Sequence, residues 1–290
     1  MAKVHASKRF MDKSSRVVTY VILTVISIVW LFPFFYLILQ SFADIQNPAY
    51  NTRSIIPNVW TLNNYKALFT DSRVPFFNWW LNTLIIAFFT AVLQTILVLM
   101  TSYALSRLRF KGRQGLMKLI LILGMFPGFL GMLVIYYILE LLHLNTSIYS
   151  LILVYTASSA MSYYVAKGFF DTIPKSLDEA VMIDGGTKNT VFWRIILPLS
   201  KPIIIYTALM AFTGPWMDFI FAKVIIGDGN PAMWTVSIGL YQMVFANQIT
   251  TPMFTIFAAG CVVVAIPIVT LFMFLQKYYV EGVTAGAVKG

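Results

Sequence analysis

Six long apolar runs constrain this 290-residue sequence more than any other feature. Each has about 18 residues or more with few charges, and together they cover 17–42, 79–105, 116–141, 148–168, 202–226 and 254–279. As a helix, each run can cross the roughly 30 Å hydrocarbon core of a bilayer with every backbone polar group satisfied. A soluble core could not bury them, because 59% of the residues are hydrophobic and 11% are charged, against about 45–50% and about 25% in soluble domains. The sequence therefore predicts an all-α membrane protein with six transmembrane helices.

The positions of the basic residues predict the orientation of these helices. With the N-terminus in the cytoplasm, only four of the 21 Lys and Arg residues fall outside, namely Arg53, Lys66, Arg73 and Lys223. Positive loops stay on the cytoplasmic side, so both termini are expected there. The net charge of +10 is explained by this topology and by attraction to anionic membrane lipid. It does not call for a nucleic-acid partner.

The loop between the fourth and fifth runs, residues 169–201, predicts a short helix on the cytoplasmic face. Ser176 and Glu179 have the spacing of a capping box, and Gly185 with Gly186 provides the expected end. Such a helix suits docking into a groove of a soluble partner. The alternative is an amphipathic segment on the membrane surface, which its acidic residues oppose. The candidate docking residues are Ser176, Leu177, Asp178, Glu179, Ala180, Val181, Asp184 and Gly185.

The same loop resembles a known signature. Glu179-Ala180-Val181, then Gly185, and after nine more residues Ile195-Ile196-Leu197-Pro198, match the spacing of the EAA motif of ABC importer permeases, with Val181 and Gly186 as small departures. Further likeness to the carbohydrate-uptake branch extends over about residues 55–290. It includes the segments Trp60 to Tyr65, Tyr103 to Arg113 and Gly168 to Pro174, and a tail similar to that of maltose-type permeases.

This resemblance implies a type I permease bundle and a set of partners. These are a second permease subunit in a heterodimer, two cytoplasmic ATPase subunits, an extracytoplasmic solute-binding protein and a carbohydrate, in a bacterial cytoplasmic (inner) membrane. The loop helix would be the coupling helix, with Glu179 facing a basic residue of the ATPase. A second docking site would be formed by the tail residues Thr284, Gly286, Lys289 and Gly290.

The implied organisation divides the chain at its first apolar run. A cytoplasmic N-terminal segment, 1–16, precedes a transmembrane permease domain, 17–290, with a core at about 75–276 and a cytoplasmic tail at 280–290.

Catalytic motifs do not occur in the sequence. The stretch Gly185-Gly186-Thr187-Lys188 lacks the Gly-Lys-Ser/Thr step of a phosphate loop. Neither a nucleophile elbow nor a metal-binding histidine pair occurs. We therefore expect a transport subunit that is not an enzyme and binds no metal or cofactor, with ATP and magnesium on the partner ATPases.

Two residues in the fifth run are candidates for the substrate path. A carboxylate within a span is costly and usually faces the bundle interior or water, which makes Asp218 the first candidate. Trp216 could stack on a sugar ring beside it. The alternative is that Asp218 lies near the outer interface and is hydrated or pairs with Lys223.

The function expected from the resemblance is half of the translocation pathway of an ATP-driven importer for a maltodextrin-type oligosaccharide. Other members of the family would carry another sugar or glycerol phosphate. An ion-coupled secondary carrier, with Asp218 as its relay, is the alternative from a different class, although no internal repeat typical of such carriers is evident.

Overall fold

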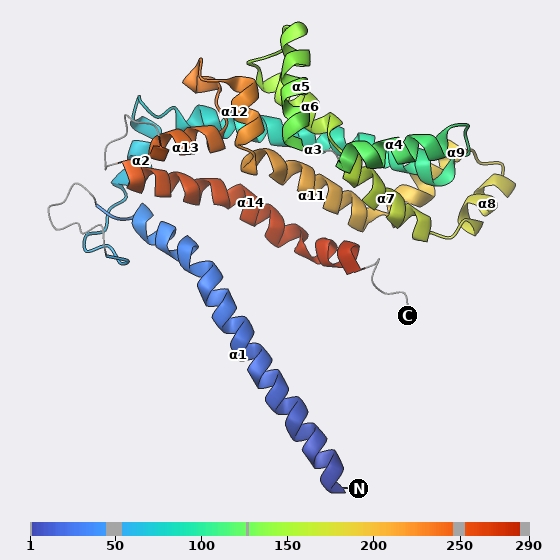
Figure 1. Ribbon diagram of the computed structural model, residues 1–290. Coiled ribbons are helices and arrows are strands. Elements are labelled where there is room, and N and C mark those ends of the chain that lie inside the picture. The colour runs from blue at the N-terminus through green and yellow to red at the C-terminus, as the bar shows by residue number, and fades with distance from the viewer. Residues whose placement is uncertain (1, 45–53, 126–127, 246–252, 285–290) are drawn as a thin grey trace. The chain divides into compact units, whose positions relative to one another are not determined.

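The computed structural model describes residues 2–44, 54–125, 128–245 and 253–284. Within these ranges the chain is mainly helical and forms no β-sheet. Ala43 and Trp60 form an isolated antiparallel bridge. The helical segments (Figure 1) are α1 (Ala2–Ser41), α2 (Asn63–Thr70), α3 (Phe76–Arg107), α4 (Arg113–Met125), α5 (Gly128–Leu141), α6 (Ile148–Ala157), α7 (Ala160–Thr172), α8 (Ser176–Ile183), α9 (Lys188–Val191), the π-helix η1 (Phe192–Ile196), α10 (Leu197–Leu199), α11 (Lys201–Met217), α12 (Ile220–Ile226), the 3₁₀-helix η2 (Pro231–Met233), α13 (Val236–Phe245) and α14 (Met253–Thr284). The expected all-α class is confirmed.

The chain forms two compact units. The first contains the described parts of 1–71 and 246–263, and the second those of 72–245 and 264–290. In the first unit, buried Asn64 joins three segments. Its amide nitrogen donates to the carbonyls of Ser41 (3.0 Å) and Ala43 (2.8 Å), and its oxygen accepts from Thr255 (3.0 Å).

Helix α3 is the central element of the second unit and packs against α11, α7 and α6. Two clusters of buried side chains lie along its length. One surrounds Ile86 with Leu151 and Ile225, and the other surrounds Val98 with Phe170, Val191 and Ile196. The second cluster therefore extends the core of this unit as far as the predicted coupling loop.

Three described helical segments are long and apolar enough to span a membrane. They are Arg16–Ser41, Phe76–Arg107 and Met253–Gln276. Two bent pairs also pass this test, Arg113–Met125 with Leu130–Leu141, and Lys188–Leu199 with Lys201–Met217. These segments identify a multi-pass membrane protein and support up to five spans.

Besides run 116–141, which forms the first of these bent pairs, two runs expected to be continuous helices are broken. Run 148–168 is interrupted at Ser158 and Ser159, where the Ser159 hydroxyl donates to the Thr156 carbonyl (2.9 Å) and so competes with the helix backbone. Run 202–226 is interrupted at Asp218, whose backbone is extended (φ −81°, ψ 119°). This break follows Pro215, which cannot donate a helical hydrogen bond.

Candidate functional site

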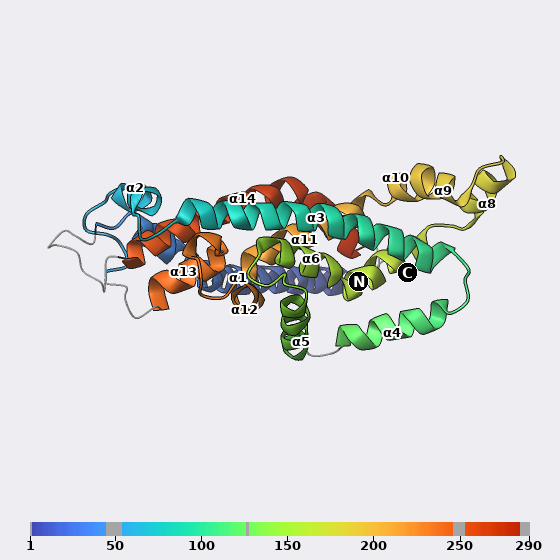
Figure 2. The same ribbon diagram turned by 90° about the horizontal axis from the view of Figure 1, so that it is seen from above.

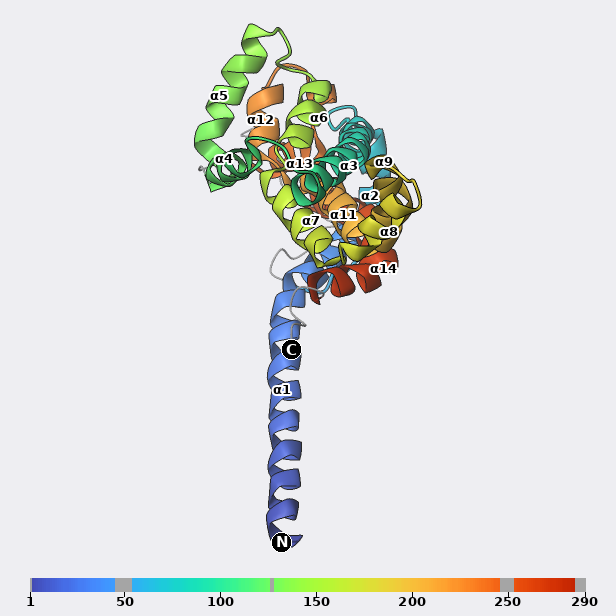
Figure 3. The ribbon, with the colours of Figure 1, turned by 90° about the vertical axis from the view of Figure 1, so that its right-hand side faces the viewer.

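Helix α8 forms the middle of the predicted docking loop. In the second unit it lies at the end where α3 finishes, opposite the end that carries α13 (Figure 2). Viewed from that end, α8 and α9 lie at the edge of this unit (Figure 3). The short helix expected from the sequence is therefore present and accessible from outside the unit.

The start of α8 differs from the expected capping box. Lys175 is the N-cap residue in helical geometry (φ −69°, ψ −20°), and no side chain caps this end. The Glu179 N–H donates to the Lys175 carbonyl (3.1 Å), so the helical turn already includes Ser176. The predicted Ser176–Glu179 box is wrong. A reciprocal capping box occurs instead at the start of α9, between Thr187 and Thr190.

The end of α8 is confirmed at the two glycines. The Gly186 N–H donates to the Val181 carbonyl (2.8 Å) and the Gly185 N–H to the Met182 carbonyl (3.2 Å), which is the Schellman pattern. Gly185 has a φ of +79°, a backbone conformation that glycine adopts without the Cβ penalty of other residues. The glycine pair thus closes the helix in a defined turn.

Most of the predicted docking residues are on the outside of α8. Exposed members of the set are Ser176, Leu177, Glu179, Ala180, Asp184 and Gly185. Val181 is half-buried and packs against the second core cluster. Asp178, by contrast, is buried. The helix therefore has an outward face that contains Glu179 and an inward face that contains Asp178 and Val181.

Arg107, the last residue of α3, is the partner of Asp178 and was not among the residues selected from the sequence. Its Nη1 lies 3.7 Å from Oδ2 of Asp178, and the two side chains are 1% and 9% exposed. Its Nη2 donates to the carbonyls of Phe170 (2.9 Å) and Ile173 (2.7 Å). Arg107 therefore holds the C-terminal end of α7 and the first turn of α8 together.

Two neighbours of Arg107 on α3 make further links to the loop. The Tyr103 hydroxyl donates to the Lys188 carbonyl at the start of α9 (2.7 Å). The Ser106 hydroxyl donates to Oδ1 of Asp171 near the end of α7 (2.6 Å). The last turn of α3 thus contacts the segments on both sides of α8.

Asp171 also accepts a hydrogen bond from Lys167, one helical turn earlier (2.5 Å). Burial raises the pKa of the Asp171 carboxyl, but hydrogen bonds from Lys167 and Ser106 outweigh it and hold the pKa below its ordinary value. The contribution of this ionised group to stability is present at neutral pH and is lost as the pH falls through the lowered pKa.

Asp218 lies at the break between α11 and α12 and is held by three donors. Its carboxylate accepts from the Tyr155 hydroxyl (2.5 Å) and from the backbone N–H groups of Phe221 and Ala222 (3.2 Å each). Lys223 instead forms an ion pair with Asp228. The alternative in which Asp218 pairs with Lys223 is therefore wrong.

Trp216 is almost fully buried, with 4% of its surface exposed. Its ring packs edge-on against Trp80 (centroids 6.1 Å apart) and near Phe212 (6.0 Å). The two candidate path residues are thus in different environments, because Asp218 is half-buried at a helix break while Trp216 packs among aromatic rings. In this structure Trp216 offers no open face for a sugar.

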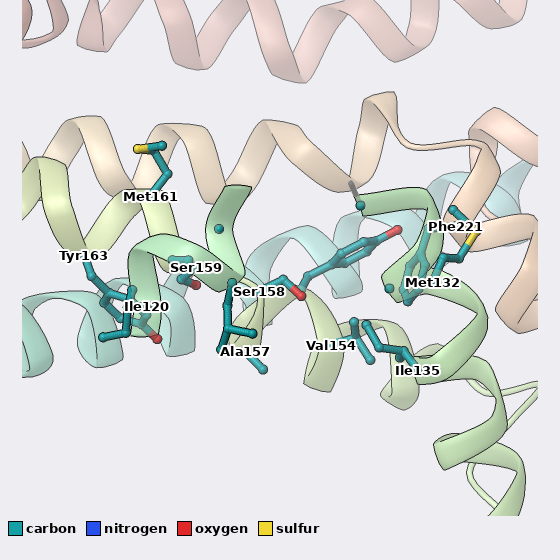
Figure 4. A pocket seen from close by; sticks show the side chains of 16 residues that line it. Ile120, Met132, Ile135, Val154, Ala157, Ser158, Ser159, Met161, Tyr163 and Phe221 are labelled. Atoms are coloured by element: carbon teal, nitrogen blue, oxygen red, sulfur yellow. The ribbon is translucent and has the colours of Figure 1, made fainter. Parts of the chain in front are cut away.

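A pocket of about 880 Å³ lies near the break between α6 and α7. Its wall includes Ser158, Ser159 and Tyr163, with Met132, Ile135 and Phe221 along the other parts (Figure 4). Tyr155, which donates to Asp218, also lines it. Hydroxyl groups, aromatic rings and apolar side chains therefore meet in one cavity, although most of its surface is apolar.

The tail candidates cannot be placed in the same way. Gly286, Lys289 and Gly290 lie outside the described residues, and of Thr284 only the backbone, at the end of α14, is described. Over the described part of the chain, no group of three or more His, Cys, Asp or Glu residues lies close enough to hold a metal ion.

Comparisons with known proteins agree with the helical architecture. The family model described as "Binding-protein-dependent transport system inner membrane component" matches residues 98–284. The galactooligosaccharides transport system permease protein GanQ of Bacillus subtilis (strain 168) is 36% identical over 276 residues, which is 94% of this chain and 95% of GanQ. The maltodextrin transport system permease protein MdxG of the same strain is 34% identical and covers 95% of this chain and 97% of its own length.

A solved structure has the same fold. It is the crystal structure of a bacterial ABC transporter involved in the import of the acidic polysaccharide alginate, with a TM-score of 0.81 at 21% identity. The match covers 92% of this chain and 97% of the other. Because the family model covers more than half of the chain and both named relatives exceed 30% identity over nearly its full length, the chain belongs to the inner membrane components of binding-protein-dependent transport systems, as a permease subunit of ABC transporters and not an ATPase.

Proposed function

We propose that this chain forms half of the translocation pathway of an ATP-driven importer for a carbohydrate, most specifically a maltodextrin-type oligosaccharide. The observation that carries the proposal is the exposed helix α8 at the edge of a permease-type bundle. A permease without its own ATPase needs a surface on which a separate ATPase can act, and α8 supplies one. The names of the relatives, which transport galactooligosaccharides and maltodextrin, support the substrate class.

The proposed assembly contains one copy of this chain, a second permease subunit, two cytoplasmic ATPase subunits and an extracytoplasmic solute-binding protein. In this arrangement the chain crosses a bacterial inner membrane six times, with both termini and α8 in the cytoplasm. Glu179 and its exposed neighbours on α8 contact the ATPase, and the tail at Thr284, Gly286, Lys289 and Gly290 is a second contact. ATP closure of the ATPase dimer favours an outward-facing state of the permeases, because its interactions differ between the two states.

We further propose that the pocket beside the α6–α7 break belongs to the pathway. Discontinuous helices expose backbone polar groups within the membrane, and such breaks are tolerated where they line a cavity. Here two breaks meet, because Tyr155 of α6 donates to Asp218 at the α11–α12 break. Asp218 thus contributes to the path by fixing the hydroxyl-bearing wall rather than by pairing with Trp216.

Filling this pocket should block transport without preventing assembly. Ser158→Trp places a large ring at an exposed position of the cavity wall, and we expect uptake to fall by more than about tenfold, equivalent to about 1.4 kcal/mol. Tyr149→Trp, on α6 at a side chain 73% exposed, is the matched control. Equal uptake by the Ser158→Trp variant and the control, at equal amounts of assembled complex, would exclude the pocket from the pathway.

The function is tested by reconstituting the chain with its partner subunits and binding protein in vesicles. We expect uptake of labelled maltodextrins that requires both ATP and the binding protein. The same assay is run in parallel with a galactooligosaccharide, another sugar and glycerol phosphate. If one of these is transported and maltodextrins are not, that compound is the substrate. Uptake driven by an ion gradient in vesicles without ATPase subunits would establish the secondary-carrier alternative.

A further inference from the structure

We propose that Arg107 is a positioning residue that, through its buried ion pair with Asp178, transmits movement of helix α8 to the membrane-spanning helix α3. This inference rests on the proposed function, because it assigns a role to the connection behind the ATPase-docking helix. In an importer of this kind, binding of the ATPase to α8 has an effect only if α8 is mechanically coupled to the helices that line the pathway. The residues around Arg107 provide such a coupling.

The ion pair between Arg107 and Asp178 is buried. Both side chains are at least nine-tenths buried, with Nη1 and Oδ2 3.7 Å apart. Buried charges are costly, and replacement of an ion pair by apolar residues of similar volume is often neutral or stabilising. A pair of this kind is therefore better suited to fixing one particular arrangement of two helices than to adding stability.

The adjacent acidic residues Asp178 and Glu179 lie on different sides of α8. Successive residues on a helix point about 100° apart, because there are about 3.6 per turn. Asp178 faces Arg107 on the inward side of α8, whereas Glu179 is exposed on the outward side. One carboxylate can thus hold α8 to α3 while the next remains available to a partner protein.

Helix α3 is connected to both ends of the α8 region. Tyr103 and Arg107 are four residues apart and so lie on one face of α3. Arg107 holds the entry to α8 through Asp178 and the Ile173 carbonyl, and Tyr103 holds its exit through the Lys188 carbonyl. A displacement of α8 therefore acts on α3 at two points, Arg107 and Tyr103.

Helix α3 runs without interruption from Phe76 to Arg107. It is a single helix of 32 residues that packs against α11, α7 and α6. Over its whole length it is also a candidate membrane span. A movement imposed on its last turn through Arg107 is thereby delivered to the elements that border the pocket, since α6 and α7 line that pocket.

The test is a double-mutant cycle in the complete reconstituted complex. The variants are Arg107→Gln, Asp178→Asn and the combination of both, with Asp178→Glu as a conservative variant. Three quantities are measured for each: the amount of co-purified ATPase, ATP hydrolysis stimulated by binding protein and sugar, and sugar transported per ATP hydrolysed. Lys223→Gln, which removes the ion pair between α12 and Asp228 and touches none of the contacts described for α8, is the matched control.

We expect each single variant to lower the transport-to-hydrolysis ratio by at least about fivefold, the lower end of the usual range for coupling between sites. Asp178→Glu should restore the ratio in part, and the control should leave it unchanged. The effects of the two single variants should be non-additive, as expected for residues in direct contact. The double variant removes both charges, so it remains informative if a single variant leaves an unpaired buried charge that impairs folding.

Additive effects in the cycle, or an unchanged transport-to-hydrolysis ratio, would overturn the proposal. Equal loss of assembly, hydrolysis and uptake in all pair variants, with no change in the ratio, would identify a purely structural role and would also overturn it. Failure of the proposed function is distinguishable, because it would appear in the unmodified complex as absent ATP-dependent uptake.

Discussion

Glu179→Lys is expected to reduce ATP-dependent uptake by more than about tenfold, a loss of at least about 1.4 kcal/mol in coupling. Glu179 is exposed in the first turn of α8, and surface substitutions of this kind usually change folding stability by less than about 0.5 kcal/mol. The effect should therefore arise at the partner surface, where a basic residue of the ATPase would face a lysine. Like charges brought together at an interface suppress binding.

The experiment measures both assembly and transport. ATPase subunits co-purified with the variant should decrease, or hydrolysis should continue without uptake. Glu140→Lys is the matched control, because it makes the same charge reversal at an exposed position of α5 and should leave ATPase co-purification unchanged. Unchanged uptake together with unchanged co-purification in the Glu179→Lys variant would refute the role of Glu179.

Gly239→Ala is expected to have the largest effect on stability. A Cβ atom at Gly239 would lie 2.1–2.5 Å from three carbon atoms of the Trp79 ring, well inside van der Waals contact. Trp79 cannot easily move away, because it is 2% exposed and its indole N–H donates to the Pro231 carbonyl (2.7 Å). Its ring also stacks on Trp234, with centroids 6.0 Å apart. Overpacking of this kind typically costs about 1–3 kcal/mol.

Thermal unfolding of the purified protein in detergent measures this effect. Gly239→Ala should lower the melting temperature by several degrees. Gly214→Ala is the matched control, because Gly214 also lies within a helix but has no atom within 4 Å of an added Cβ. Alanine is favoured over glycine in helices by about 1 kcal/mol, so the control should be neutral or slightly stabilised. The same melting temperature for both variants would contradict the close contact between α13 and Trp79.

The elements with strong local signals could be predicted from the sequence. Run 79–105 is one uninterrupted helix, α3, because its apolar composition is not opposed by any local breaker. The helix at 176–183 and its end at Gly185 could also be predicted, since a glycine with positive φ is a local feature of the chain. The helix at 176–183 forms the proposed docking surface, and α3 contacts it through Arg107.

The interruptions of the apolar runs could not be predicted from hydrophobicity alone. In run 148–168, the apolar composition predicts one continuous helix, whereas the Ser159 hydroxyl bonds to the backbone at the break between α6 and α7. At Asp218, the decisive interaction is with Tyr155, which is 63 residues away in sequence. Hydrogen bonds between residues so far apart in sequence cannot be predicted from a local apolar pattern.

Arg107 was missed for a related reason. In the sequence it counted as one of the cytoplasmic positive charges, which predict orientation and imply exposure. The available signal was its position four residues after Tyr103 at the very end of an apolar span, where a charged side chain can turn inward towards loop carbonyls. Similarly, Trp79 lies at the start of an apolar run, a position typical of aromatic residues at the membrane interface, but it is buried against Gly239.

The central claim, that α8 is the surface on which an ATPase acts, is tested most directly by site-specific photo-cross-linking. A photoreactive residue at Ile183, which is 86% exposed at the end of α8, should cross-link to the ATPase subunit in membranes that contain the complete complex. The same probe at Tyr149, 73% exposed on α6, should not. Cross-links from Ile183 to lipid or to other subunits, with none to the ATPase, would contradict the account.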